Sequence, residues 1–507
     1  MPSINITQNG ILKLLRELKI HKASGPDELS CRLLKELANE ISPAYTIFFQ
    51  ASIEQGRMPA EWKSANVIPI FKKGDKQKAE NYRPVSLTSI TCKLLEHVIC
   101  SNILRHLDAH SILTDTQHGF RRGRSCETQL IITIEDLVRS MDNSTQTDVI
   151  LLDFAKAFDK VPHARLLYKL SFYGIRHQQH RWIADFLGNR KQQVVLENST
   201  SSSAPVLSGV PQGSVLGPLL FLLFINDLPD CVSPGTKVRL FADDCALYRE
   251  IKSDRDCEIL QADLDKLQLW EKDWMMEFHP HKCQVMNVTK KRTKIQHAYK
   301  IHGQTLSVEK SVKYLGVNIN EKLSWNEHIG KITKKAHNTL NFVQRNTSRC
   351  PRETKVLCYT TLIRPLVEYC GVVWDPHTKC NINAIEWVQR RAARYVTGDF
   401  RRTSSVTEML NLLKWKTLEE RRRQAKAMMM YKILNELVAL PKPMVLSAVS
   451  ATRGNLVRLQ VPQCRTELYK ASFYPSTIGI WNNIPLRSKL TTLDQFKAFL
   501  SRLNSKP

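Results

Sequence analysis

The amino-acid sequence predicts an α+β protein in which helices surround an antiparallel sheet and a basic, mainly helical region follows. Two short apolar runs flank a pair of adjacent aspartates at residues 238–248, the pattern of a strand, a tight turn and a second strand. Residues 148–153 form a continuous apolar run between two carboxylates, as expected of a strand covered on both faces. From about Leu323 onward the apolar residues recur at helical spacing.

The chain carries a large excess of positive charge. Its 507 residues contain 74 Lys and Arg against 48 Asp and Glu, which gives a formal net charge of +26 and a pI of about 9.6. An excess of this size indicates a polyanionic partner, and nucleic acid fits better than a membrane surface. The apolar share of 42% is that of a folded protein, and the length predicts about two to four domains.

Cysteine usage and hydropathy indicate an intracellular protein. The 13 cysteines include no C-x-x-C pair, which argues against a disulfide framework or a zinc ribbon and favours reduced thiols. The apolar run at 215–225 contains Gly217 and Pro218 and is too short and too broken to span a bilayer. The N-terminus lacks the basic-then-apolar pattern of a signal peptide. We therefore expect an intracellular location, nuclear or cytoplasmic, and no membrane partner.

The N-terminal part of the chain predicts helices around one strand. Residues 11–20 have Leu and Ile at helical spacing, and a second helical pattern runs from about residue 29 to 55, where a glycine follows. Residues 65–71 are typical of a strand. Pro69 within them predicts an edge strand or a short one, because proline donates no ladder hydrogen bond. A further helix is expected at about 90–110.

The middle of the chain alternates between helices and strands. A helix is expected near 163–173, after the strand that ends at Asp153. Residues 191–207 predict a hairpin with a serine-rich connection. Residues 208–218 form a glycine-rich loop that opens a very apolar helix reaching about Leu228.

The adjacent aspartates Asp243 and Asp244 lie at the predicted tip of their hairpin. In a regular strand neighbouring side chains point to opposite faces, so only a turn can aim both carboxylates at one site. Two carboxylates this close repel each other unless a cation lies between them. Taken alone, the dipeptide favours an ordinary surface turn, because aspartate is a common turn residue. The rest of the chain decides between a surface turn and a metal site.

The region after this hairpin becomes increasingly basic. Residues 260–274 predict an amphipathic helix, 283–288 a strand, and 313–317 a short strand and turn. Residues 331–355 contain seven Lys and Arg and one acidic residue, and residues 390–426 contain eleven against four. A solvated helix face explains such charge most simply. With the excess over the whole chain, contact with a nucleic-acid backbone is favoured.

A third carboxylate, Asp153, ends the strand at 148–153. If this strand and the hairpin are neighbours, Asp153, Asp243 and Asp244 form one acidic patch on the sheet. Phosphoryl transfer onto a 3′-hydroxyl uses two divalent ions, one at the attacking hydroxyl and one at the triphosphate and its leaving group. Mg²⁺ keeps several waters, so a few carboxylates plus substrate oxygens suffice and no His or Cys cluster is needed.

Seven motifs, in order and at plausible spacing, resemble the reverse transcriptase of non-LTR (LINE-type) retrotransposons, most of all the jockey-like branch. They are residues 22–27 (KASGPD), 81–87 (NYRPVSL), 117–121 (QHGFR), 152–159 (LDFAKAFD), 209–218 (GVPQGSVLGP), 241–244 (FADD) and 314–316 (YLG). Any one of these is a weak signal, whereas seven in order are a strong one. The resemblance covers about residues 20–320 and continues more weakly through the basic tail.

The resemblance implies a right-hand polymerase with fingers, a palm built on the antiparallel sheet and a helical thumb. The expected domains are an N-terminal helical extension at 1–65, fingers and palm at 66–320, a thumb-like helical region at 321–400, and a basic C-terminal region of unknown role at 401–507. The implied activity is that of an RNA-directed DNA polymerase, which adds deoxynucleotides to a DNA 3′-end on an RNA template by two-metal-ion catalysis. Expected cofactors are two Mg²⁺ ions, with Mn²⁺ as a substitute. Expected partners are an RNA template, a DNA primer or nicked target DNA, and deoxynucleoside triphosphates.

The resemblance also implies catalytic roles. Asp153, Asp243 and Asp244 match the carboxylates that bind the metal ions, and the backbone carbonyl of Phe154 is expected to complete the shell of one ion. Lys282 matches a lysine that protonates the leaving pyrophosphate, although an ordinary surface lysine explains it nearly as well.

Nucleotide selection is expected at Phe158, which matches the bulky ring beneath the sugar that leaves no room for a 2′-hydroxyl. Without its motif, Phe158 would be interpreted as an ordinary core residue. Asp159 is the rival carboxylate, and we interpret it as structural, as a helix cap before Pro162.

The remaining matched residues are expected to hold the nucleotide and the primer. Lys72, Lys73 and Arg83 match cations that bind the triphosphate. Gln212 and Gly213 match contacts to the incoming nucleotide, where glycine permits close approach of the backbone. Tyr314, Leu315 and Gly316 resemble the primer grip, and a plain β-turn is the alternative.

Some expected parts of a complete element are absent from this sequence. We find no upstream endonuclease, no Cys–His knuckle and no ribonuclease H carboxylate set, so the chain is expected to be the polymerase part of a longer element protein or a truncated copy. An inactive, transposon-derived nucleic-acid-binding protein is the alternative function. An RNA-directed RNA polymerase is a third hypothesis, and Phe158 argues against it.

Overall fold

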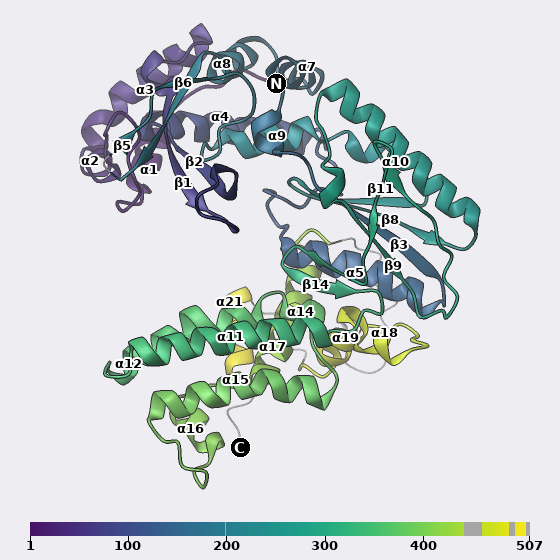
Figure 1. Cartoon of the computed structure of the whole chain (residues 1–507). Coiled ribbons are helices and arrows are strands. Elements are labelled where there is room, and N and C mark those ends of the chain that lie inside the picture. The colour runs from purple at the N-terminus through teal and green to yellow at the C-terminus, as the bar shows by residue number, and fades with distance from the viewer. Residues whose placement is uncertain (198, 441–458, 486–491, 503–507) are drawn as a thin grey trace.

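The computed structural model describes residues 1–197, 199–440, 459–485 and 492–502. A first sheet with the N-terminal helices, a second sheet, and a group of C-terminal helices follow one another around an open arch (Figure 1). The N-terminal helices are α1 (Gln8–Arg16), α2 (Cys31–Glu36) and α3 (Ala38–Gln55), followed by the 3-10 turn η1 (Ala60–Lys63). The helix predicted at 29–55 is therefore two helices, which meet at Leu37. It ends where predicted, because Gly56 adopts the left-handed conformation with φ of 63°.

The first sheet has the strand order β2-β1-β4-β5, and β6 also pairs with β4. Its strands are β1 (Ser64–Phe71), β2 (Tyr82–Leu87), β4 (Arg190–Leu196), β5 (Ser199–Thr200) and β6 (Ala204–Val206). The prediction of an edge or a short strand at 65–71 does not hold for the whole of β1, since it lies between β2, which pairs with residues 66–71, and β4, which pairs with residues 64–67. Pro69 lies beyond the reach of β4, so its missing N–H interrupts no ladder on that side.

The second sheet places the predicted apolar strand at its centre, in the order β12-β9-β3-β8-β7. Its strands are β3 (Gln146–Leu152), β7 (Thr236–Phe241), β8 (Asp244–Ile251), β9 (Gln284–Val288) and β12 (Ser307–Val308). Helix α10 (Asp254–Trp274) covers one face and α5 (Cys126–Asp142) covers the other (Figure 1). Ile150 packs in the core that contains α10, and Val149 packs in the core that contains α5. The prediction of a strand covered on both faces is confirmed.

Helices and short 3-10 turns lie between the strands, within and between the two sheets. They are α4 (Ile90–Ala109), α6 (Ala157–Lys160), α7 (His163–Phe172), α8 (His177–Leu187), α9 (Leu216–Phe224), η2 (Ala79–Asn81), η3 (Leu228–Cys231) and η4 (Pro280–Lys282). Two small hairpins follow the second sheet. They are β10 (Lys300–Ile301) with β11 (Gln304–Thr305), and β13 (Ser311–Tyr314) with β14 (Val317–Asn320).

From Asn326 onward the described residues contain helices and no strands. The helices are α11 (Asn326–Asn346), α12 (Arg352–Cys358), α13 (Arg364–Glu368), α14 (Gly371–Trp374), α15 (Lys379–Thr397), α16 (Val406–Leu412), α17 (Leu418–Leu434), α18 (Glu467–Ala471), α19 (Phe473–Asn482) and α21 (Leu493–Arg502), with a π-helical turn, η5 (Tyr359–Ile363), between α12 and α13. In the parts of the chain that the structure describes, no helix combines the length and the apolar character needed to cross a bilayer.

Part of the positive charge of the tail is used inside the protein. Arg422 and Lys426 on α17 are buried and both form ion pairs with Asp375, at 2.8 and 2.7 Å. Arg421 forms an ion pair with Glu368. These cations are committed to internal partners, so only the remaining exposed Lys and Arg of residues 390–426 face solvent.

The C-terminal segment docks on the end of α5. The Asp142 carboxylate accepts hydrogen bonds from Arg465 N at 3.1 Å and from Thr466 N and Oγ1 at 2.8 and 2.7 Å. The Tyr469 hydroxyl donates to Glu135 at 3.1 Å. Residues more than 320 positions apart in sequence therefore share one buried polar contact beneath the second sheet.

We expect Asp142→Ala to lower the free energy of unfolding by about 1–3 kcal/mol, because it removes three partly buried hydrogen bonds to one carboxylate, two of them from backbone N–H groups. The measurement is the midpoint of chemical denaturation. Asp494→Ala is the control, since its carboxylate is 91% exposed and, among the described residues, pairs only with Lys497 three residues away. Equal midpoints for the two variants would show that the Asp142 contact does not hold the segment.

Candidate active site

The second sheet brings the three predicted carboxylates to one end. Asp153 follows β3 directly, and Asp244 is the first residue of β8. These two strands are hydrogen-bonded neighbours, with Leu152 opposite Cys245. Asp243 lies in the two-residue turn between β7 and β8, where Phe241 pairs with Asp244. The condition for a single acidic patch, that the strand at 148–153 and the hairpin are neighbours, is therefore met.

The two carboxylates of the turn influence each other and Asp153. Both side chains reach solvent at the tip, but the protein around their bases partly desolvates them. Desolvation raises the pKa of Asp244 to about 6, with further contributions from the negative charges of Asp243 and Asp153. Desolvation and the charge of Asp153 also raise the pKa of Asp243. The site therefore holds negative charge at a cost that a bound cation would relieve.

The donor set suits a hard divalent cation. All three side chains are carboxylates, the ligand type that Mg²⁺ prefers, and a solvent-exposed rim leaves room for water and substrate oxygens. Within the described residues, no three Asp, Glu, His or Cys side chains already stand close enough together to hold a metal ion. The three aspartates are thus neighbours that do not surround an ion completely. This arrangement suits an ion that completes its coordination shell with substrate oxygens.

Lys282 is the cation nearest to Asp153. Its Nζ lies 3.5 Å from Asp153 Oδ1, and both side chains are about half exposed. Lys282 ends η4, and its backbone N–H is held by the carbonyl of His279, whose own N–H donates to Asp153 O at 2.7 Å. The structure therefore places Lys282 at the carboxylate site.

Phe154 is held firmly beside the carboxylates. Its ring is buried and stacks on Phe278 with 4.5 Å between centroids. The neighbouring backbone is paired with the same segment, since Ala155 N donates to Glu277 O at 2.8 Å. The chain after Asp153 is thereby fixed before it turns into α6.

The predicted triphosphate cations lie in and beside the β1–β2 turn. Arg83 on β2 and Lys72 after β1 are exposed, and their positive charges lower the pKa of Asp243 against the larger effect of desolvation. The positive charge of these two cations thus acts on the Asp243 carboxylate. Lys73 is exposed in the same turn.

Phe158 is half-buried on α6 between two rings. It stacks on the buried Phe221 of α9, with 4.4 Å between centroids, and meets the exposed Phe120 edge-on at 6.3 Å. One face is therefore supported by the core and the ring cannot turn freely. A side chain that excludes a ligand sterically has to be held in a fixed position, and this support provides it.

The glycine-rich loop before α9 contacts β2 and α6, the helix that carries Phe158. Gln212 O accepts from Ser86 N at 2.8 Å, and Gln212 Nε2 donates to Asp159 Oδ1 at 2.8 Å. The interpretation of Asp159 as a helix cap is wrong, because α7 begins after Pro162 without a side-chain cap. Asp159 instead orients Gln212, which a reading of local sequence patterns does not reveal.

Gly213 has to be a glycine. Its φ is 113°, and an added Cβ would lie 2.4 Å from the carbonyl oxygen of Ser86. We expect Gly213→Ala to destabilise the protein by about 1–3 kcal/mol through backbone strain, and more through the clash. The measurement is the thermal denaturation midpoint.

Gly303→Ala is the matched control for this substitution. Gly303 also has a positive φ, of 72°, but an added Cβ there meets nothing within 4 Å. Similar losses in the two variants would mean that positive φ alone, and not the contact with Ser86, requires glycine at 213.

The turn at Tyr314–Gly316 is anchored on two sides. The buried Tyr314 hydroxyl accepts from Gln129 Nε2 at 2.9 Å, and Leu315 O accepts from the Tyr369 hydroxyl at 3.0 Å. Leu315 and Gly316 both have positive φ, of 45° and 86°. The turn is thus fixed to α5 on one side and to Tyr369, among the C-terminal helices, on the other.

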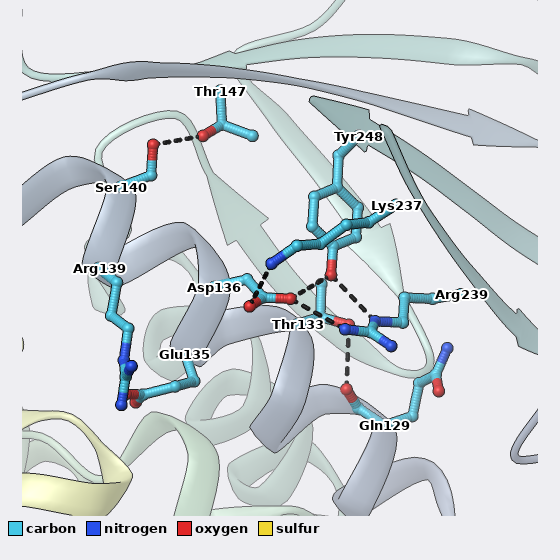
Figure 2. A network of polar contacts seen from close by, with 10 residues as sticks. All are labelled: Gln129, Thr133, Glu135, Asp136, Arg139, Ser140, Thr147, Lys237, Arg239 and Tyr248. Atoms are coloured by element: carbon cyan, nitrogen blue, oxygen red, sulfur yellow. Dashed lines mark hydrogen bonds and ion pairs between the residues drawn. The ribbon is translucent and has the colours of Figure 1, made fainter. Parts of the chain in front are cut away.

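A polar network that the sequence patterns did not reveal braces the aspartate hairpin (Figure 2). Asp136 on α5 accepts from Lys237 Nζ at 2.7 Å, Arg239 Nη2 at 3.0 Å and the Tyr248 hydroxyl at 2.6 Å. Side chains two positions apart on a strand lie on one face, so the sequence indicates that Lys237 and Arg239 share a face of β7. Their partner on a helix 100 residues earlier was not predictable from local patterns.

Comparison with known protein families agrees with this architecture. Residues 70–319 match the family described as reverse transcriptase (RNA-dependent DNA polymerase). This stretch contains all three carboxylates, the glycine-rich loop and every strand of both sheets except most of β1, which begins at Ser64. Residues 70–319 are therefore a reverse transcriptase domain.

Its relatives come from mobile elements. The chain is 30% identical over 413 residues to the RNA-directed DNA polymerase from mobile element jockey of Drosophila melanogaster. The aligned region covers 78% of this chain and 44% of the relative. It is 28% identical over 416 residues to the probable RNA-directed DNA polymerase from transposon BS of the same species, covering 78% and 45%. The jockey polymerase of Drosophila funebris is 26% identical over 409 residues, covering 78% and 44%. The chain thus spans about half the length of these relatives.

Proposed function

We propose that this chain is an RNA-directed DNA polymerase of a non-LTR retrotransposon, which extends a DNA 3′-end with deoxynucleotides on an RNA template. The observation that carries the proposal is the meeting of Asp153, Asp243 and Asp244 at one end of the second sheet. The mobile-element relatives support the same activity.

The proposed layout is a right hand. The first sheet with its helices forms the fingers, the second sheet forms the palm, and the helices that begin at α11 form the thumb. Residues 1–65 are the N-terminal extension, residues 66–320 the fingers and palm, residues 321–400 the thumb-like region, and 401–507 the basic C-terminal region. The arch in Figure 1 supports this order, because the first sheet and the helices from α11 onward then lie at its two ends, with the second sheet between them.

Asp153, Asp243 and Asp244 would hold two Mg²⁺ ions, with Mn²⁺ as a substitute, and the Phe154 carbonyl would add a ligand. When bound, these ions lower the pKa of the primer 3′-hydroxyl and neutralise the charge of the triphosphate. Lys282, next to Asp153, donates a proton toward the leaving pyrophosphate.

The other matched side chains bind and orient the substrates. Lys72, Lys73 and Arg83 hold the triphosphate from the fingers, and the Gln212–Gly213 backbone lies against the nucleotide. Phe158, supported from behind by Phe221, excludes a 2′-hydroxyl. The turn at 314–316 holds the primer strand.

Primer extension tests the proposal. Purified chain is incubated with poly(rA)/oligo(dT), dTTP and Mg²⁺, and product is measured with and without EDTA. We expect extension that EDTA abolishes and that added Mg²⁺ restores. If the chain binds the template–primer with a steep salt dependence but gives no product under any divalent cation, the non-catalytic alternative is correct.

A further inference from the structure

The segment before α5 forms an extra edge of the second sheet, beside the aspartate turn. Leu240 N donates to Thr116 O at 3.0 Å and His118 N donates to Leu240 O at 2.8 Å, so residues 116–118 run along β7. Gln117 and His118 belong to the QHGFR motif at 117–121, to which the proposed function assigns no role.

Gln117 reaches from this edge to the turn. Its side chain is 1% exposed, and its Oε1 accepts from the backbone N–H of Ala242 at 2.9 Å and of Gly119 at 2.7 Å. Its Nε2 is buried without a hydrogen-bond partner in the described residues. A buried amide left unpaired is unfavourable. The useful part of this side chain is therefore the oxygen that holds Ala242.

The residue that Gln117 holds is strained. Ala242 has φ of 52°, in the left-handed region that is unfavourable for a residue with a Cβ, and it directly precedes Asp243. Gly119 lies so close that an added Cβ would be 2.3 Å from Ala242 N. The 117–119 segment is thus fitted to the backbone of the turn itself.

We propose that Gln117 is a positioning residue for the aspartate pair. By binding the N–H of the strained Ala242, it sets the directions in which Asp243 and Asp244 leave the turn. The Asp136 network in Figure 2 braces the body of the hairpin at Lys237, Arg239 and Tyr248, and it leaves the turn to Gln117. The catalytic consequence of this role rests on the proposed polymerase function.

Gln117→Met tests the role, because methionine keeps the length of the side chain and removes the acceptor. Gln146→Met is the matched control. Gln146 is also fully buried and holds a distant backbone segment, with Oε1 accepting from Ile295 N at 3.1 Å and Nε2 donating to Ile295 O at 2.8 Å. It lies at the opposite end of β3 from Asp153. Both variants lose a buried glutamine, and only one touches the turn.

Two readouts are measured on the full-length chain. Amide hydrogen exchange of a peptide spanning 240–245 is expected to speed up in Gln117→Met and not in Gln146→Met. In primer extension, Gln117→Met is expected to lower kcat about tenfold to a hundredfold, as small misplacements of catalytic groups do, with KM for dTTP unchanged. Gln117→Glu keeps an acceptor for both N–H groups and is expected to retain more turnover than Gln117→Met.

Each outcome decides the proposal. Equal exchange at 240–245 in the Gln117→Met and Gln146→Met chains overturns it, and so does faster exchange in Gln117→Met with wild-type kcat. Faster exchange confined to Gln117→Met, in a chain whose wild type shows no polymerase activity, supports the fixing of the turn and rejects the proposed function instead.

Discussion

Asp243→Asn is expected to reduce primer extension by about three orders of magnitude or more, since metal-ion stabilisation contributes several kcal/mol and each 1.4 kcal/mol is about tenfold in rate. Asparagine has the same shape but lacks the negative charge that binds the cation. The measurement is dTTP incorporation on poly(rA)/oligo(dT) at saturating Mg²⁺.

The same substitution should not lower stability. Desolvation and repulsion raise the pKa of Asp243, so the folded state holds the proton more tightly than the unfolded chain does. Ionisation of this group therefore costs stability as pH rises through its unfolded and then its folded pKa. Removing the charge should leave the thermal midpoint at neutral pH equal or higher. Loss of activity without loss of stability is typical of a functional carboxylate.

Asp254→Asn is the control for the Asp243 substitution. Asp254 is an exposed aspartate at the start of α10, beyond the far end of β8 from the turn. It should retain wild-type activity. Wild-type activity in Asp243→Asn would remove this residue from the metal site, and an equal loss in both variants would point to a nonspecific effect.

Phe158→Val is expected to improve the use of ribonucleotides relative to deoxynucleotides by about tenfold to 200-fold. This is the range of substrate discrimination that a small difference in the size of a hydrophobic pocket produces. Valine removes the ring that would occupy the space of a 2′-hydroxyl and keeps an apolar contact with α9. The measurement is the ratio of kcat/KM for UTP and dTTP on the same primer–template.

The ring that supports Phe158 provides the control. Phe221→Leu removes the stacked partner, whose centroid is 4.4 Å away, and leaves the Phe158 ring in place. It should lower stability because a fully buried ring is lost, and it should change selectivity less than Phe158→Val. If Phe158→Val uses dTTP normally and still rejects UTP, Phe158 is a core residue and not a gate.

Residue patterns predicted the parts of this fold that depend on local periodicity. The continuous apolar run between Asp148 and Asp153 predicted a strand covered on both faces, and β3 lies at the centre of the second sheet. The paired runs around Asp243 required a hairpin, and β7 and β8 form it. Pro69 was less informative, because its missing N–H constrains one position and not the whole of β1.

The sequence by itself determined which carboxylates, cations and rings are available, in which order, and that two aspartates share one turn. Only the tertiary structure decided what holds them. The oxygen of Gln117 binds Ala242 across 125 positions, Asp136 gathers three donors from β7 and β8, and Asp159 orients Gln212 and caps no helix. Such contacts join residues far apart in the chain, where local spacing carries no information about distance. The directions of the two aspartate side chains therefore depend on the packed molecule, whereas the presence of two adjacent carboxylates is fixed by the sequence alone.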